Sequence, residues 1–225
     1  MALADRFPGD GPHLERYARV MNAAEINSSF HRAHRRSAYE RWAAAVPAGF
    51  AFSVKIPKTI SHEKRCAGCE REFEQFLEET SGLGRSRLLL LLQLPPKFEF
   101  DEERMERFFA LCRRDDAPPV VCEPRHASWF TAQADASLKR WRVPRVAADP
   151  PRVDGGSVPG GWTSIGYFRM HGAPRVYYSS YSDERVAQLA SMMAHVSNET
   201  WCIFDNTASG AAAENALRLR MNVLP

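Results

Sequence analysis

Two carboxylates and two histidines stand at positions where short apolar segments of the sequence end. Glu25 lies in AAEI (23–26), and Glu123 closes VVCE (120–123). Carboxylates and imidazoles that face one another can exchange protons with a substrate as general acid and general base. The predicted catalytic residues are Glu25, Glu123, His126 and His171.

Basic, amide and aromatic side chains gather near the same segment ends. Guanidinium groups suit bidentate capture of phosphate or carboxylate. Arg169 lies inside an apolar segment, so it needs a buried partner such as Glu123 or Asp205. Structural ion pairs between the carboxylates and these cations are an equally open interpretation. The predicted ligand-binding residues are Asn27, Lys55, His62, Gln93, Arg125, Trp129, Arg169 and Asn206.

The sequence gives little sign of a metal or redox centre. No tight motif such as H-E-x-x-H joins the histidines to the carboxylates, so no metal ligands are predicted, although a divalent metal stays open. CAGC (66–69) lacks the second cysteine pair of a zinc site, and we interpret it as a coincidence. Five cysteines, an odd number, favour reduced thiols in a cytoplasmic protein.

Helices and strands that would position these residues alternate along the chain. Apolar residues recur with i, i+3, i+4, i+7 spacing in 14–21, 105–112 and 186–193, which predicts three amphipathic helices. Between the helices lie short apolar segments, several of them continuously apolar, as strands covered on both faces are. The seven predicted strands are AAEI (23–26), FAFSVK (50–55), LLLLLQL (88–94), VVCE (120–123), VPRVAA (143–148), IGYFRM (165–170) and WCIFD (201–205).

Strict alternation of strand and helix implies parallel strands joined by right-handed crossovers. Seven strands fall one short of a TIM-type (β/α) barrel, and we predict a single barrel domain over residues 1–225 with its first strand missing. An open doubly wound sheet ranks second, because no Gly-rich phosphate fingerprint follows any strand. In a barrel all strand ends open at one rim, so the predicted site residues would meet there.

Composition and charge exclude some classes of protein. The chain has 225 residues, 44% hydrophobic and 25% charged, with a net charge of +3, which is too small for a histone-like nucleic-acid binder. The longest apolar run, Leu88–Leu92, is far shorter than the ~20 residues of a membrane helix. The opening MALADRFPGDG has no apolar core of a secretory signal. We expect no membrane partner.

The order of these motifs resembles the YecE-like family, catalogued as domain of unknown function 72. The matching stretches follow one another through nearly the whole chain from Phe7 onward. They are EINSSF (25–30), FSVKIP (52–57), LQLPPKF (92–98), CEPRHASW (122–129), YFRMHG (167–172) and FDNTASGAAAENA (204–216). The resemblance implies a (β/α) barrel with site positions at its strand ends, and it names no reaction.

Two departures from the family pattern matter. Family sequences begin with a strand similar to I-G-T-S-G-W, and nothing of this kind precedes Phe7. Without that strand, the strands that carry Glu25 and Asp205 would have open edges, so we expect self-association there. In addition, His31 stands where the family usually carries tyrosine.

These observations predict a protein that acts on or binds a small anionic or phosphate-bearing ligand, with nucleic acid as one possibility. A phosphodiester hydrolase-like activity is the most specific form of this hypothesis. Two alternatives stay open. One is a non-catalytic nucleic-acid or anionic-metabolite binding protein. The other is a carbohydrate-active enzyme in which two carboxylates flank a sugar.

Overall fold

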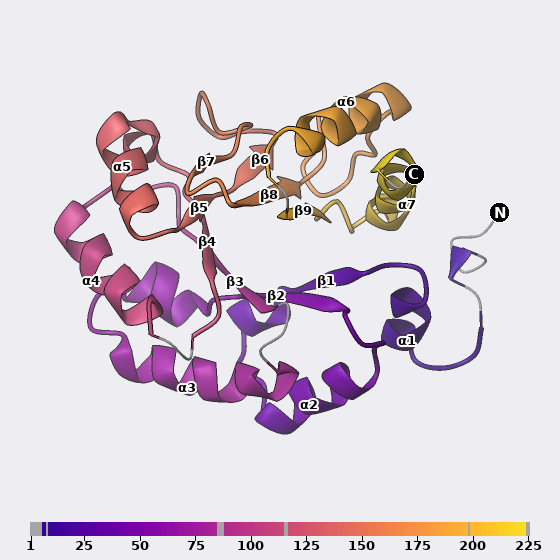
Figure 1. Ribbon diagram of the computed structural model, residues 1–225, viewed down its shortest axis with the longest axis horizontal. Coiled ribbons are helices and arrows are strands. Elements are labelled where there is room, and N and C mark those ends of the chain that lie inside the picture. Colours follow the sequence, from indigo (N-terminus) through magenta and orange to yellow (C-terminus); the bar gives the residue numbers. More distant parts are fainter. Residues whose placement is uncertain (1–5, 8, 85–87, 115–116, 198, 224–225) are drawn as a thin grey trace. The chain divides into compact units, whose positions relative to one another are not determined.

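The computed structural model describes residues 6–7, 9–84, 88–114, 117–197 and 199–223 (Figure 1). Their contacts divide the chain into two compact units, residues 1–122 and 123–225. Each unit contains both strands and helices. The single domain expected over residues 1–225 stays a prediction.

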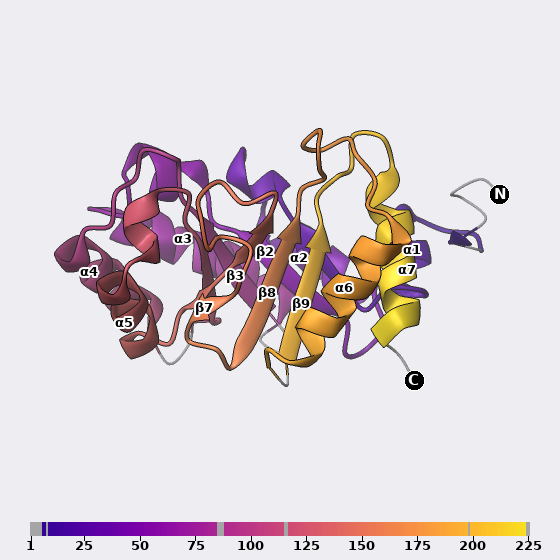
Figure 2. The same cartoon turned by 90° about the horizontal axis from the view of Figure 1, so that it is seen from above.

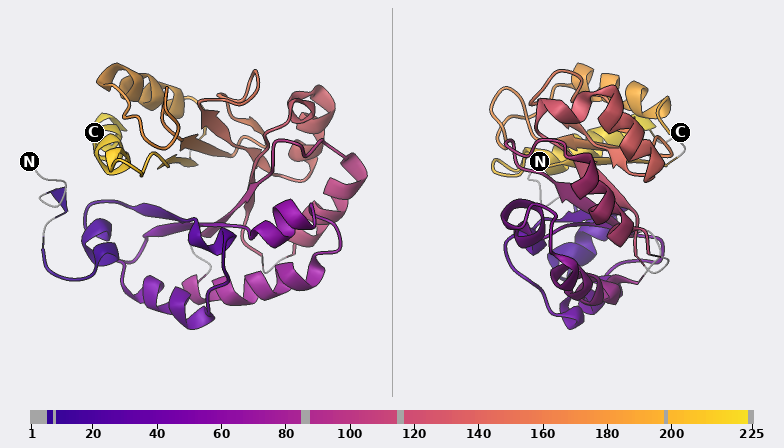
Figure 3. Two further views of the ribbon diagram at one scale, coloured as in Figure 1. Left: turned by 180° about the vertical axis from the view of Figure 1, so that it is seen from behind. Right: turned by 90° about the vertical axis from the view of Figure 1, so that its left-hand side faces the viewer.

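Strands and helices alternate in the first unit. Its strands lie in the order β1-β2-β3-β4, and the pairs β1–β2 and β2–β3 are parallel. Helices α2 and α3 lie along one face of these strands (Figure 3). The elements are α1 (His13–Ala18), β1 (Ala23–Ile26), α2 (Arg36–Ala44), β2 (Ala51–Lys55), α3 (Glu70–Thr80), β3 (Leu88–Gln93), α4 (Glu102–Cys112) and β4 (Val120–Glu123), whose last residue begins the second unit.

The expected periodicities account for the packing of the first unit. All six residues of β3 are buried, as a continuously apolar strand requires when both of its faces are covered. In α4 the four residues at 105, 108, 109 and 112 are buried, which confirms the predicted apolar stripe. Asp101 begins this helix by accepting a hydrogen bond from the backbone N–H of Arg104 at 3.0 Å.

The second unit contains a three-stranded parallel sheet in the order β6-β8-β9. Figure 2 shows β8 and β9 side by side, with α6 and α7 next to them. The strands are β5 (Pro144–Arg145), β6 (Ala147–Asp149), β7 (Gly160–Gly161), β8 (Ile165–Met170) and β9 (Glu199–Phe204). The helices are α5 (Ala132–Arg140), α6 (Asp183–Ala194) and α7 (Ala211–Val223), together with the short 3₁₀ helix η5 (Ala127–Phe130).

The core of the second unit lies between this sheet and helices α6 and α7. Phe168 and Phe204 from the strands pack in one cluster with Val186 and Leu189 from α6 and Leu219 from α7. This arrangement confirms the apolar stripe predicted at 186–193. Full burial of a large apolar side chain contributes about 1.5–3 kcal/mol, so this cluster is a main source of stability for the unit.

The predicted strand 143–148 is divided in two, because its halves pair with different partners. Arg145 pairs antiparallel with Gly160, whereas Ala147 pairs parallel with Phe168. The partner of the first half, β7, lies within the Gly/Pro-rich segment 149–162, where no strand was predicted. Gly161 makes the β5–β7 pair possible: its φ is +62°, and a Cβ there would lie 2.6 Å from the Val143 carbonyl oxygen.

The α/β architecture predicted from the sequence is confirmed, with strands that are mostly parallel and an antiparallel β5–β7 pair. A closed barrel is not: in the part of the chain that the structure describes, no sheet closes on itself. There, β1 pairs only with β2, and β9 pairs only with β8.

Candidate functional site

The parallel register of the second unit brings three polar strand ends together. Met170 pairs with both Asp149 and Phe204, so His171 and Asp205 follow adjacent strands at the same level. The backbone N–H of His171 donates to the Asp149 carbonyl at 2.7 Å. Because side chains alternate across a strand, Arg169 and His171 point to the same face of β8. The site therefore follows directly from strand register.

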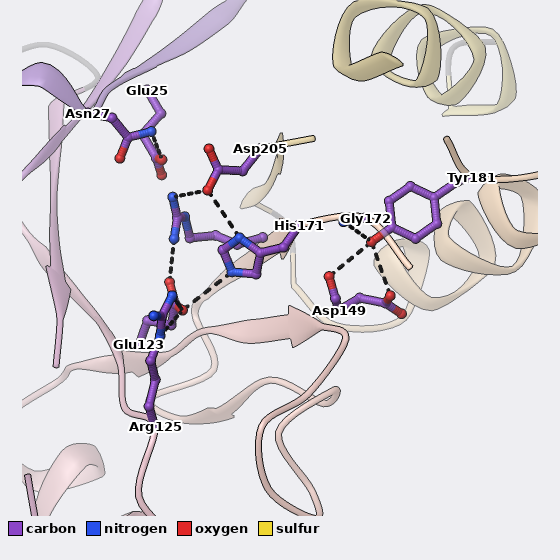
Figure 4. A network of polar contacts seen from close by, with 10 residues as sticks. Glu25, Asn27, Glu123, Arg125, Asp149, His171, Gly172, Tyr181 and Asp205 are labelled. Atoms are coloured by element: carbon purple, nitrogen blue, oxygen red, sulfur yellow. Dashed lines mark hydrogen bonds and ion pairs between the residues drawn. The ribbon is translucent and has the colours of Figure 1, made fainter. Parts of the chain in front are cut away.

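Arg169 forms two buried ion pairs on this face. Its guanidinium donates through Nη1 to Glu123 Oε2 at 2.6 Å and through Nη2 to Asp205 Oδ2 at 3.1 Å (Figure 4). The side chains of Arg169 and Glu123 are 1% and 2% exposed. The sequence-based expectation that Arg169 needs Glu123 or Asp205 as a buried partner is confirmed, and both carboxylates form ion pairs with it.

Glu123 is the most heavily paired carboxylate of the site. Besides Arg169, it accepts hydrogen bonds at Oε1 from Nε and Nη2 of Arg125, at 3.0 and 2.9 Å. Burial alone would raise the pKa of Glu123, but the Arg169 charge, the close contact with His171 and the Arg125 charge hold it well below its usual range. Glu123 is therefore an anion at neutral pH.

His171 lies between the two carboxylates and is itself buried, at 5% exposure. Its Nδ1 is 3.1 Å from Asp205 Oδ2, within hydrogen-bond distance. Its Nε2 lies 3.4 Å from Glu123 Oε1, an ion-pair distance without hydrogen-bond geometry, so this nitrogen has no hydrogen-bond partner. Burial would lower the pKa of His171, but its contacts with Asp205 and Glu123 outweigh burial and raise the pKa.

A cavity of about 250 Å³ borders this group of charges. Glu123, Arg125 and His171 line its polar side. Most of its other lining residues are apolar, and they include Phe130, Val146, Ala148, Pro150, Pro151 and Val153. Tyr177 and Arg152 also line it. All these residues belong to the second unit. The cavity thus has a charged end and an apolar end, the usual character of a small-molecule site.

Other predicted residues of the second unit have structural surroundings. Asn206 is 0% exposed and donates through Nδ2 to the Ser179 carbonyl and to Asn215 Oδ1. Trp129 is 0% exposed and lies in the core. His126 accepts at Nδ1 from the backbone N–H of Ser128 and so caps η5. The ligand or catalytic roles expected for these residues stay predictions.

The first unit holds the remaining predicted residues, in two groups of contacts. Asn27 donates through Nδ2 to Glu25 Oε1 at 2.8 Å. Lys55 Nζ lies 4.2 Å from the centre of the Phe30 ring, and this ring also contacts His62 edge-on at 4.9 Å. Both groups lie where β1 and β2 end. Gln93, at the end of β3, is 5% exposed. The sequence-based roles of these five residues stay predictions.

Sequence reasoning missed the residues that form the sides of the cavity. Tyr177 lies in the segment between β8 and α6, and the prolines lie in the Gly/Pro-rich segment 149–162, for which no site residue was predicted. The Pro-Pro pair beside Asp149 was the available signal. For Tyr177 no signal exists, because its position depends on a left-handed backbone conformation with φ of +71°.

The described part of the chain does not have the geometry of a metal site, a membrane helix or a disulfide. No group of three or more His, Cys, Asp or Glu side chains there has the arrangement of a metal site. None of its helices is both long enough and apolar enough to cross a membrane. The five cysteines are free thiols, and Cys66, Cys69, Cys112 and Cys122 are buried.

Comparison with known proteins gives a family. The family model described as "Protein of unknown function DUF72" matches residues 5–224. The UPF0759 protein YecE of Escherichia coli strains K12 and O157:H7 is 33% identical over 85 residues, 38% of this chain and 31% of the relative. The match thus spans less than a third of the length of these curated relatives.

Two solved structures of DUF72 family proteins share the fold. One, EF0366 from Enterococcus faecalis V583, superposes with a TM-score of 0.81 at 23% identity and covers 94% of this chain and 88% of its own. The other, TM1631 from Thermotoga maritima MSB8, gives a TM-score of 0.76 at 23% identity over 92% of this chain and 86% of its own. Fold and family model agree, and the chain belongs to the DUF72 family.

Proposed function

We propose that the cavity of the second unit binds a small phosphate-bearing ligand at its charged end. Arg125 uses Nε and Nη2 for Glu123, and Nη1 donates to no acceptor in the described residues. His171 Nε2 has no hydrogen-bond partner there. Arg125 and His171 both line the cavity, and guanidinium and imidazolium N–H groups are suitable donors for phosphate oxygens.

The charge balance of the site supports an anionic ligand. Arg125, Arg169 and protonated His171 carry three positive charges against the two negative charges of Glu123 and Asp205. The net charge is then +1, and it falls to zero when His171 loses its proton. We therefore expect binding to weaken as the pH rises through the raised pKa of His171.

The reaction proposed for this site is hydrolysis of a phosphate ester. Water attacks phosphorus, the bond from phosphorus to the leaving oxygen breaks, and His171 Nε2 gives its proton to that oxygen. The proton released by the attacking water then restores His171. Glu123 and Asp205 orient the imidazole and stabilise its charged form, a positioning role in place of the proton transfer predicted for Glu123 from the sequence.

A non-catalytic binding protein is the second candidate. The observation in its favour is that Glu123 accepts hydrogen bonds from Arg125 and Arg169, so it is poorly suited to act as a general base. His171 is then the group at the cavity that can exchange a proton. Under this reading the same residues hold the anion without breaking a bond. Nucleic acid would be a partner of either form, and its binding would weaken steeply with salt.

The wider features expected from the sequence belong to this proposal too. A TIM-type (β/α) barrel with seven of eight strands is supported by the alternation of parallel strands and helices. A cytoplasmic location is supported by the five free thiols.

Binding of inorganic phosphate and of a chromogenic phosphate ester tests the proposal. The variants are Arg125→Met and His171→Gln, with Arg175→Met as the matched control, because Arg175 contacts Tyr178 and does not line the cavity. We expect the first two variants to lose binding and the control to keep it. Wild-type protein that binds no phosphate at pH 6 would refute the proposal. Wild-type protein that binds phosphate and the ester without turnover would favour the non-catalytic candidate.

A further inference from the structure

Tyr177 has a backbone conformation that its side chain disfavours. Its φ is +71°, a region that bulky residues rarely occupy. Two hydrogen bonds hold it there: its N–H donates to the His171 carbonyl at 2.6 Å, and its carbonyl accepts from the Ala208 N–H at 3.1 Å. Glycine would satisfy this backbone without strain, so the aromatic side chain needs a separate reason to stand here.

The ring of Tyr177 borders the proposed phosphate site. It meets the His171 ring edge-on, with 6.0 Å between centres and 87° between planes. The residue is 42% exposed and lines the same cavity as Arg125. Its hydroxyl makes no hydrogen bond to the described residues, and His171 is its aromatic partner among them. Much of this ring therefore remains open to a ligand.

The opposite character of the two ends of the cavity restricts the ligand. A bare phosphate would fill only the end formed by Arg125, Glu123 and His171 and would leave the apolar lining from Pro150, Pro151 and Val153 in water. A ligand with a flat or cyclic group attached to its phosphate would cover that apolar lining and pack against the Tyr177 ring.

We infer that the ligand of this cavity is a nucleoside monophosphate or a close relative, whose ring system packs against Tyr177 while its phosphate binds Arg125 and His171. The inference rests on the proposed function, since it uses the same phosphate site. Contact between a base and an aromatic side chain commonly changes affinity by about fivefold or more on alanine substitution. Ribose 5-phosphate, which lacks the base, should bind more weakly than the complete nucleotide.

Calorimetric titration with three probes tests the inference: uridine 5′-monophosphate, ribose 5-phosphate and inorganic phosphate. Tyr177→Gly removes the ring and relieves the backbone strain, so it should fold at least as stably as wild type. Tyr177→Phe keeps the ring. Tyr178→Ala is the matched control, because Tyr178 is equally exposed, at 44%, but contacts Arg175 and does not line the cavity.

We expect Tyr177→Gly to weaken the nucleotide at least about fivefold and to leave inorganic phosphate unchanged. Tyr177→Phe should keep most of the nucleotide affinity, and Tyr178→Ala all of it. Equal affinity of wild type for nucleotide and inorganic phosphate, or an unchanged nucleotide affinity in Tyr177→Gly, would overturn the inference and leave the phosphate site standing. Failure of wild type to bind any of the three probes would refute the proposed function and the inference together.

Discussion

Substitution of Glu123 by glutamine removes the anion on which the site depends and keeps its size. Arg169, at 1% exposure, would then lose its ion pair with Glu123 and keep the one with Asp205, and Arg125 would lose its carboxylate partner. Loss of one partner from a buried ion pair costs about 3–5 kcal/mol. Because the glutamine carbonyl still accepts a hydrogen bond, we expect a loss near the lower limit, about 3 kcal/mol. In a chain of this size that corresponds to a Tm roughly 6–12 °C lower.

Thermal unfolding followed by circular dichroism measures this effect, and Glu103→Gln supplies the control. Glu103 pairs with Arg107 at 3.1 Å, but its side chain is 80% exposed, so the same charge change should have little effect there. The double variant Glu123→Gln/Arg169→Met should be more stable than the sum of the single effects predicts, because it no longer leaves a buried arginine without the Glu123 carboxylate.

The pH dependence of the Glu123 effect has a defined sign. A carboxyl whose pKa is lower in the folded protein stabilises it above the unfolded pKa, about 4.3, and this contribution is lost as the pH falls through the folded pKa. The difference between wild type and Glu123→Gln should therefore be lost as the pH falls below about 4.3. It should also shrink as the pH rises through the raised pKa of His171, because Glu123 is one cause of that raised pKa. Equal Tm values for Glu123→Gln and Glu103→Gln would refute the idea that the Glu123 ion pairs stabilise the second unit.

Four further results are expected. Because the pKa of His171 is raised in the folded protein, its protonation stabilises the fold fully below the unfolded pKa of about 6.5. This stabilisation is lost as the pH rises through the folded pKa, so the Tm of wild type should fall over that pH range. The Tm of His171→Gln should fall less over the same range. An NMR titration midpoint for His171 below about 6.5 would contradict this sign. Asn215→Leu removes the side-chain acceptor of the buried Tyr181 N–H and the amide donor to the Tyr181 carbonyl. Urea unfolding should show a loss of about 1–3 kcal/mol, and an unchanged midpoint would speak against that role. Burial raises the pKa of the Cys66, Cys69 and Cys112 thiols, so a thiol reagent at pH 8 should label them slowly in the native protein and rapidly in urea, and equal rates would show that they are accessible. Strands β1 and β9 each have one hydrogen-bonded neighbour in the described residues, so light scattering should find masses above 25.4 kDa that grow with concentration; a constant monomer mass would remove this expectation.

Features carried by local pattern could be predicted from the sequence. The segments 23–26, 120–123 and 165–170 form strands at the predicted bounds, because short, mainly apolar runs between helical patterns are typical of strands in an alternating α/β chain. The pairing of Arg169 was predictable for a different reason. A charge inside an apolar strand must find a counter-charge, and few carboxylates follow neighbouring strands.

Features that depend on long-range partners could not be predicted. The division of 143–148 at Val146 arises because β7 and β8 take separate halves of the segment, and nothing within the segment records this choice. The interior position of Asn215 depends on its five hydrogen-bond contacts with the segment 180–181 and Asn206, which lie on other elements. Tyr177 enters the cavity lining through a backbone conformation that propensity argues against.

The position of Arg169 inside β8 also limits how the chain can fold. In the native alignment Arg169 stands opposite Ile203, two residues before Asp205. A slip of β9 by one residue would turn the Asp205 side chain to the other surface of the sheet. Arg169 would then remain in the interior without the Asp205 carboxylate. The ion pair between Arg169 and Asp205 would therefore disfavour misaligned forms of this sheet during folding, in addition to its place in the candidate site.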